Sequence, residues 1–165
     1  MKTENITFRT YVKIEDIEDV TSIVRSTGYF REDEVIVARE LVEEKFNKGK
    51  ESSYEFIFAE SEGKTVAYSC FGLIPCTLKS YDLYWIATHN DFRGKGIGRV
   101  VLKQTEDAVN RLGGKTVYVE TSSKEQYIST RIFYEKNNYI LKARFEDFYD
   151  IGDDKFVYIK VVSWE

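Results

Sequence analysis

Hydrophobic residues recur along the 165-residue chain with two different spacings, one typical of strands and one typical of helices. Apolar positions alternate with polar or small ones over 6–12, which predicts a first strand. Apolar residues three and four apart then predict two helices, the first closed by Gly28 and the second running over 31–48 to Gly49. The chain therefore begins with a strand and a helical pair.

The middle of the chain has the pattern of a meander. Two strands are predicted over 54–60 and 65–73, joined by a hairpin turn, and a short apolar strand follows over 83–88. After Gly98 the apolar spacing changes to that of a helix, with one face formed by Val101, Thr105, Ala108, Val109 and Leu112. Two consecutive glycines then end this helix.

The last third adds a strand over 115–121, a short helix ending near Lys136 and a closing hairpin over 139–146 and 156–162. Ser122 and Ser123 are expected to cap the short helix. The hairpin is expected to place apolar residues on one face of each strand: Leu141, Ala143 and Phe145, then Val157, Ile159 and Val161. The order β-α-α-β-β-β-α-β-α-β-β predicts a mixed seven-stranded α/β sheet with helices on both faces, and we expect 1–165 to form a single domain.

Composition excludes several classes of protein. Hydrophobic residues make up 42% and charged residues 32%, as in globular proteins. A net charge of −4 argues against nucleic-acid binding through phosphate neutralisation. The chain has neither a membrane-length apolar run nor a signal peptide at its start, so we expect a cytoplasmic protein without a membrane partner. Cys70, Cys76 and the lone His89 do not have the spacing of a metal site.

One stretch carries a chemical signal. Three glycines alternate with other residues in Arg93-Gly94-Lys95-Gly96-Ile97-Gly98, directly before the predicted helix. Glycines let the backbone turn sharply and approach a ligand, and the first turn of a helix offers unpaired N–H donors to an anion. Arg93, Lys95 and Arg99 add positive charge. The stretch therefore suits a phosphate group.

Three kinds of phosphate loop can be compared with this stretch. The ATP-type loop requires Lys and then Ser or Thr after its last glycine, where this chain has Ile97-Gly98. The dinucleotide loop requires a third glycine where this chain has Arg99, although Glu120, 22 residues after Gly98, suits that interpretation. What does match is (Gln/Arg)-x-x-Gly-x-(Gly/Ala), as Arg93, Gly96 and Gly98. This pattern resembles the acetyl-CoA pyrophosphate loop of the GNAT N-acetyltransferase superfamily.

A second segment supports the resemblance. Residues 88–98 are similar to the family's V-x-P-x-(Y/F)-R-G-x-G-I-G, and residues 130–139 to its A-x-x-(L/F)-Y-E-K-x-G-F. Asn90 replaces the usual Pro and Asn138 the usual Gly, while Tyr127 and Thr130 replace the common Asn and Ala. Residues 1–80 match the family only in the order of their elements.

The resemblance implies the GNAT acyl-CoA N-acyltransferase fold, with acetyl-CoA as co-substrate and no metal. It also implies that the central strand separates from its neighbour after residue 86, where its backbone would pair with pantetheine. The cofactor-binding residues implied in this way are Ile86, Ala87, Thr88, Arg93, Gly94, Lys95, Gly96, Ile97, Gly98, Arg99, Tyr127 and Thr130.

Acetyl transfer to an amine requires a neutral nucleophile and a proton for the leaving thiolate. A lysine-like amine is neutral only about once in 2,500 molecules at pH 7, so a base or a desolvating pocket must assist. By position in the family motif, Tyr134 is the expected general acid. Asp82, at the strand position where some relatives carry a catalytic Glu, and Glu120, at the end of the next strand, are rival bases.

The sequence therefore predicts an N-acetyltransferase that acts on a primary amine of a small molecule or peptide, with a second copy of the chain as a further possible partner. The alternative is a non-catalytic acyl-CoA-binding or regulatory domain that keeps the loop without turnover. The intact Tyr134 and the carboxylates close to the expected cleft favour the enzyme.

Overall fold

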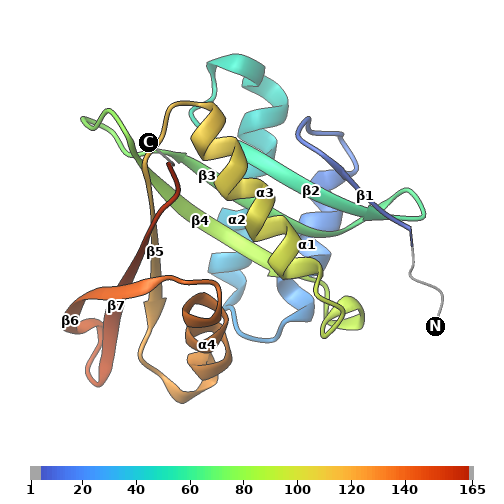
Figure 1. Ribbon diagram of the computed structural model, residues 1–165. Coiled ribbons are helices and arrows are strands. Elements are labelled where there is room, and N and C mark those ends of the chain that lie inside the picture. The colour runs from blue at the N-terminus through green and yellow to red at the C-terminus, as the bar shows by residue number, and fades with distance from the viewer. Residues whose placement is uncertain (1–4, 164–165) are drawn as a thin grey trace. The chain divides into compact units, whose positions relative to one another are not determined.

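The computed structural model describes residues 5–163 and contains the predicted sheet (Figure 1). The hydrogen-bonded strand order is β1-β2-β3-β4-β5-β7-β6. Strands β4 and β5 are parallel, whereas β1–β2, β2–β3, β5–β7 and β7–β6 are antiparallel, so the mixed sheet is confirmed. The elements are β1 (Ile6–Arg9), α1 (Asp16–Ser26), α2 (Glu32–Lys48), β2 (Glu55–Ser61), β3 (Lys64–Leu73), β4 (Ser80–Thr88), α3 (Ile97–Arg111), β5 (Thr116–Ser122), α4 (Ile128–Lys136), β6 (Ile140–Asp150) and β7 (Asp153–Val161).

The described chain divides into two compact units. The first comprises 5–72 and 85–105, and the second 73–84 and 106–163. Strand β4 and helix α3 each contribute to both units.

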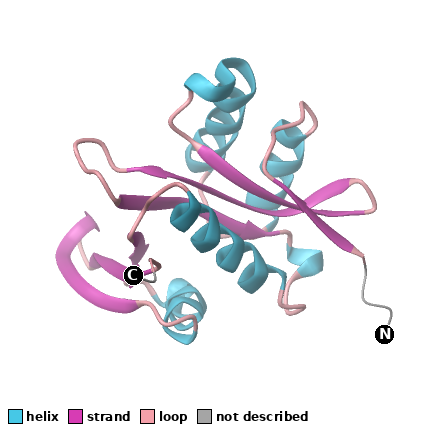
Figure 2. Ribbon diagram, turned by 45° about the horizontal axis from the view of Figure 1, so that its top comes forward, coloured by secondary structure: helices cyan, strands magenta, loops and turns pink. Residues whose placement is uncertain are grey.

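Successive residues of β3 point to opposite faces of the sheet, and this alternation determines which of them enter the core of the first unit. Tyr68 and Cys70 belong to a core formed with apolar residues of α1, α2 and β2, in which the rings of Phe56 and Phe58 stack at 5.3 Å. Ser69 points to the other face, as the two-residue period of a strand requires, and its Oγ lies 2.6 Å from Oγ1 of Thr105 in α3. Helices therefore cover both faces of these strands (Figures 1 and 2).

The first strand is shorter than the sequence pattern predicts. It pairs with β2 only from Ile6 to Arg9, because the chain then turns into α1. The Arg9 guanidinium donates to both carboxylate oxygens of the fully buried Asp16, which also accepts from the backbone N–H of Lys13 at 2.7 Å. Val12, predicted to lie in the strand, packs against the core from the loop.

The second unit has a core of aromatic rings on one face of its strands. Val117 and Val119 of β5 are buried beside Tyr158 of β7, and α4 packs Tyr134 against Tyr158. The serine caps predicted for the short helix were wrong. Ser122 is the last residue of β5, and α4 begins at Ile128 after a 3₁₀ turn, without a side-chain cap.

The closing hairpin is longer than predicted, and its outer strand is largely exposed. β6 continues to Asp150, β7 begins at Asp153, and Leu141 and Phe145 are about half exposed on the outermost strand. The prediction that Leu141, Ala143 and Phe145 share one face was wrong for Leu141, because the register shifts after it: Leu141 pairs with Tyr158 and Ala143 with Val157, which point to opposite faces.

Candidate functional site

The glycine loop of the first unit has the backbone of an anion site. Gly94 and Gly96 have φ angles of +77° and +79°, which side-chain-bearing residues rarely adopt, and a Cβ on either would meet no atom within 4 Å. Helix α3 begins at Ile97, and the N–H of Val100 bonds to the carbonyl of Gly96 at 3.4 Å. The N–H groups of the helical residues before Val100 have no partner within the helix and remain available to a ligand.

Three exposed cations flank this backbone, as the sequence predicts. Arg93 donates weakly to the Tyr29 hydroxyl at 3.4 Å, and the Lys95 ammonium lies 5.1 Å from the centre of the Phe92 ring. Arg99 projects from the first turn of α3. Open space, positive charge and a helix N-terminus together suit the pyrophosphate of a coenzyme.

The residues just before the loop are held by the first unit. Ile86 and Thr88 are partly buried at the end of β4, with Ala87 packed into the core. His89 completes a turn, because its Nδ1 accepts from the N–H of Asp91 at 3.1 Å. Trp85 packs edge-on against Phe30 at 5.0 Å, a contact between β4 and the α1–α2 loop that the sequence pattern did not reveal.

Tyr134 lies at the centre of the aromatic core of the second unit. Its ring is 5.5 Å from those of Phe133 and Tyr139 and 6.2 Å from that of Tyr158. Among residues 5–163 its hydroxyl has no hydrogen-bond partner, and burial raises its pKa well above the usual value. Tyr127 and Thr130 lie at the start of the same helix, both partly buried.

The two neighbouring tyrosines differ from Tyr134 in this respect. The Tyr139 hydroxyl donates to Oε2 of Glu106 and the Tyr158 hydroxyl to Oε1 of Glu135, each at 3.1 Å. Of the three rings, only that of Tyr134 therefore carries a hydroxyl free for another group.

The two carboxylates predicted as rival bases lie on the opposite face of the sheet from Tyr134. Asp82 is the register partner of Tyr118, and Glu120 lies two residues further along β5 on the same face. Val119, between Tyr118 and Glu120, pairs with Tyr158 on the face that α4 covers. Burial and the nearby charge of Glu120 raise the pKa of Asp82, and Lys155 opposes that rise.

The parallel ladder between β4 and β5 ends at the pair Asp82–Tyr118. The sequence predicted that the central strand would separate after residue 86, so the ladder ends earlier than expected. Within the second unit, the two strands therefore lack ladder hydrogen bonds from Leu83 onward, close to Asp82 and Glu120.

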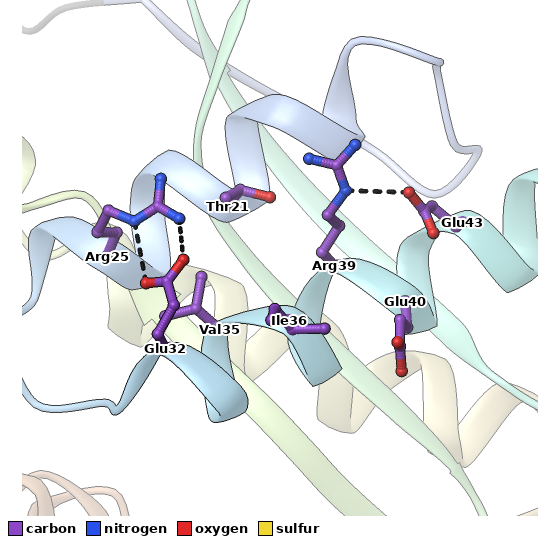
Figure 3. A pocket seen from close by; sticks show the side chains of 8 residues that line it. All are labelled: Thr21, Arg25, Glu32, Val35, Ile36, Arg39, Glu40 and Glu43. Carbon is purple, nitrogen blue, oxygen red and sulfur yellow. Dashed lines mark hydrogen bonds and ion pairs between the residues drawn. The ribbon is translucent and has the colours of Figure 1, made fainter.

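A separate cavity of about 360 Å³ lies between α1 and α2 (Figure 3). Its walls include two ion pairs, Arg25 with Glu32 at 2.5 Å and Arg39 with Glu43 at 3.0 Å. No residue predicted for the site lines this cavity. Its charged walls are largely paired with one another.

Residues 5–163 contain neither a membrane-spanning helix nor a cluster of metal-ligating side chains. No helix in this part of the chain is both long and apolar enough to cross a membrane. The same residues contain no group of three or more His, Cys, Asp or Glu side chains placed to hold a metal ion.

Comparisons with known proteins agree with this geometry. A solved structure described as an acetyltransferase of the GNAT family, from Desulfovibrio desulfuricans, matches with 37% identity and a TM-score of 0.94, covering 96% of this chain and 99% of that one. The fold also matches the Escherichia coli ribosomal-protein-S18-alanine N-acetyltransferase, at 17% identity, TM-score 0.75 and coverage of 97% and 96%.

An aminoglycoside 6'-N-acetyltransferase solved with coenzyme A has 16% identity, a TM-score of 0.77 and coverage of 96% of this chain and 98% of that chain. No curated protein matches the chain in sequence. The family model described as the acetyltransferase (GNAT) domain matches residues 52–141, more than half of the chain. With this match and the Desulfovibrio structure, the chain belongs to the GNAT family of acetyltransferases.

Proposed function

We propose that this protein transfers the acetyl group of acetyl-CoA to a primary amine of a small molecule or peptide. The amine nitrogen attacks the thioester carbonyl directly, so that a C–N bond forms and the C–S bond breaks. A carboxylate of the second unit takes the proton that the amine loses, and Tyr134 gives its phenolic proton to the departing thiolate.

The observation that carries this proposal is the unengaged hydroxyl of Tyr134 within a cluster where the neighbouring hydroxyls are bonded. Its raised pKa keeps the phenol protonated at neutral pH. A thiolate leaving into the same low-dielectric surroundings would also have a raised pKa, since burial disfavours both anions. The proton transfer therefore does not need a phenol of ordinary acidity.

The cofactor half of the proposal rests on the glycine loop. The backbone N–H groups of residues 94–99 and the three cations would hold the pyrophosphate, and the end of β4 would pair with pantetheine. Acetyl-CoA would supply the activated acyl group. The open space beside Gly94 and Gly96 fits a bulky anion.

Calorimetric titration with acetyl-CoA, NAD and ATP tests the cofactor. We expect binding of acetyl-CoA alone. Binding of NAD or ATP without acetyl-CoA would refute the proposal. A thiol-release assay over a panel of amines then separates an enzyme from the alternative, because binding without release on any amine would indicate a non-catalytic acyl-CoA-binding module.

Replacing Tyr134 by Phe tests the acid. The ring and its packing remain, while the proton donor is lost, so kcat should fall by roughly two orders of magnitude or more, with a much smaller change in KM for acetyl-CoA. Tyr158→Phe is the matched control, since it removes a hydroxyl from the same cluster that already bonds to Glu135. The loss of this hydrogen bond in Tyr158→Phe should lower the melting temperature. Equal kcat values for the two variants would contradict the assignment.

A further inference from the structure

The side chain of Lys155 in β7 is held on three sides. Its ammonium lies 3.5 Å from Oε1 of Glu120, 4.0 Å from the centre of the Phe148 ring and 5.2 Å from that of Phe145. Only 15% of the side chain is exposed. Cation–π contact with two rings and attraction to a carboxylate fix the ammonium in place.

The backbone of the hairpin builds this arrangement. Lys155 pairs directly with Phe145 of β6 and with Ser122 of β5, so Glu120 is its diagonal neighbour on the same face. Between Phe145 and Asp150 the register shifts, and the extra residues of β6 bring Phe148 over the ammonium.

This bulge is fixed by hydrogen bonds. Asp147 adopts a φ of +52°, its N–H donates to Oδ1 of Asp154 at 2.9 Å, and its carboxylate accepts from the N–H of Gly152 at 2.7 Å. Phe148, the residue after Asp147, is thereby held in position beside Lys155.

The ion pair with Lys155 distinguishes Glu120 from Asp82, its rival as the base. Glu120 is bound to Lys155, whereas Asp82 has no hydrogen bond or ion pair among the described residues and is half-buried. Glu120 already has an ammonium as its partner, whereas the Asp82 carboxylate has no partner among the described residues and can accept a proton from a ligand. This difference between the two carboxylates favours Asp82 as the base.

We propose that Lys155 is a positioning residue of this reaction: by pairing with Glu120 it leaves Asp82 as the carboxylate that takes the proton of the acceptor amine. This inference rests on the proposed function and deepens it.

The groups that act on Asp82 come from three strands. Its charged neighbours are Glu120 of β5 and Lys155 of β7, and its register partner is Tyr118 of β5. Tyr149 of β6 completes the surroundings of Glu120, since burial first and then the Glu120 charge raise the pKa of Tyr149 to about 12. Tyr149 is therefore neutral over the working pH range, and Lys155 and Glu120 act on Asp82 in opposite directions.

The test is the pH profile of kcat/KM for the full chain with saturating acetyl-CoA and the best amine found. Lys155→Met keeps the length and apolar stem of the side chain and removes its charge. We expect the acid limb of the profile to move to higher pH in Lys155→Met and to lower pH in Glu120→Gln. Lys142→Met, which removes an exposed lysine of β6, is the control and should leave the limb in place.

Asp82→Asn should lose the acid limb together with at least a hundredfold of kcat/KM. An acid limb that stays fixed in both Lys155→Met and Glu120→Gln, or moves in the same direction in both, would overturn the role of Lys155. Near-normal activity in Asp82→Asn with loss of activity in Glu120→Gln would reverse the two carboxylates.

A second readout separates this inference from the proposed function. The carboxyl carbon of Asp82, followed by NMR in selectively labelled protein, should titrate at higher pH in Lys155→Met than in the wild type, whether or not an amine is turned over. Absence of thiol release from any amine would refute the proposed function, while an unchanged Asp82 titration would refute the charge coupling itself.

Discussion

Tyr68 is a second tyrosine whose hydroxyl lies in an apolar environment. It is fully buried in β3 among the stacked rings of Phe56 and Phe58, and its hydroxyl has no partner among the described residues. A buried hydroxyl without a hydrogen bond costs about 1–3 kcal/mol of stability. Unlike Tyr134, this residue belongs to the first unit and to none of the positions implied for the site, so we assign it no chemical role.

Removing that hydroxyl should stabilise the protein. Tyr68→Phe keeps the ring and eliminates the unsatisfied group, so the free energy of unfolding should rise by about 1 kcal/mol in chemical denaturation. Tyr158→Phe, in which a bonded hydroxyl is lost, should shift stability in the opposite direction. A lower stability for Tyr68→Phe would show that the hydroxyl is satisfied in solution, for example by a buried water.

At the scale of elements, a substitution in the glycine loop can distinguish a change of backbone conformation from a loss of contact with the ligand. Asn tolerates a positive φ, so Gly96→Asn should keep the fold while placing a side chain in the open space beside the backbone. We expect the affinity for acetyl-CoA to fall at least tenfold by calorimetry, about 1.4 kcal/mol.

Gly63 in the β2–β3 turn offers a matched control for the loop variant. Its φ is +80°, and a Cβ there would also meet no atom within 4 Å. Gly63→Asn should therefore have the same backbone cost and unchanged affinity. If both variants bind acetyl-CoA like the wild type, the pyrophosphate lies away from this loop.

The junction of β1 and α1 makes part of the stability depend on pH. Glu60 accepts from Lys13 at 2.9 Å and from Arg9 at 2.7 Å, and these bonds hold its pKa below the usual 4.5. A lowered pKa contributes stability above the ordinary value that is lost as the pH falls through the lowered one. Glu60→Gln should therefore lower the free energy of unfolding by about 1–3 kcal/mol at pH 7. Urea titrations of both proteins between pH 7 and 2 should show the difference shrinking below pH 4.5, and a constant difference would contradict this account.

Much of this architecture could be predicted because it depends on local pattern. The alternation around Tyr68, the helical spacing of α3 and the glycines of its preceding loop each indicate structure without knowledge of distant contacts. The predicted extension of β1 to residue 12 and the serine caps of α4 failed because tertiary contacts prevailed. Arg9 binds Asp16 and directs the chain into the helix, while Ser122 is drawn into β5 and bonds to Asp153.

Lys155 shows what a sequence pattern alone does not reveal. Its neighbours Phe148 and Glu120 lie 7 and 35 residues away in the sequence, and they meet it only because β6 bulges and β7 pairs between β5 and β6. A lysine in an alternating strand is usually solvated, and no local signal distinguishes this one. The turn residues Gly152, Asp153 and Asp154 indicate a hairpin, but they do not indicate its bulge.

At the scale of the whole molecule, the matched family segment contains the proposed catalytic and cofactor-binding residues but not Lys155. The matched family segment spans 52–141 and includes the glycine loop, Asp82, Glu120 and Tyr134. Lys155 and its bulge lie beyond that segment, in the closing hairpin. The residues proposed for the acyl transfer therefore lie within the matched segment, whereas Lys155, the proposed partner of Glu120, lies outside it.

The bulge of β6 has an evolutionary consequence. Residues 146–149 lie outside the strand ladder, so their number can change without moving any paired residue of β6 or β7 to the other face of the sheet. A lineage could therefore lengthen, shorten or replace this short insert and alter what lies beside Lys155 and Glu120, while the register that supports Tyr158 and the aromatic core stays the same. The hairpin thereby allows changes beside Lys155 and Glu120 that leave the pairing of its strands unchanged.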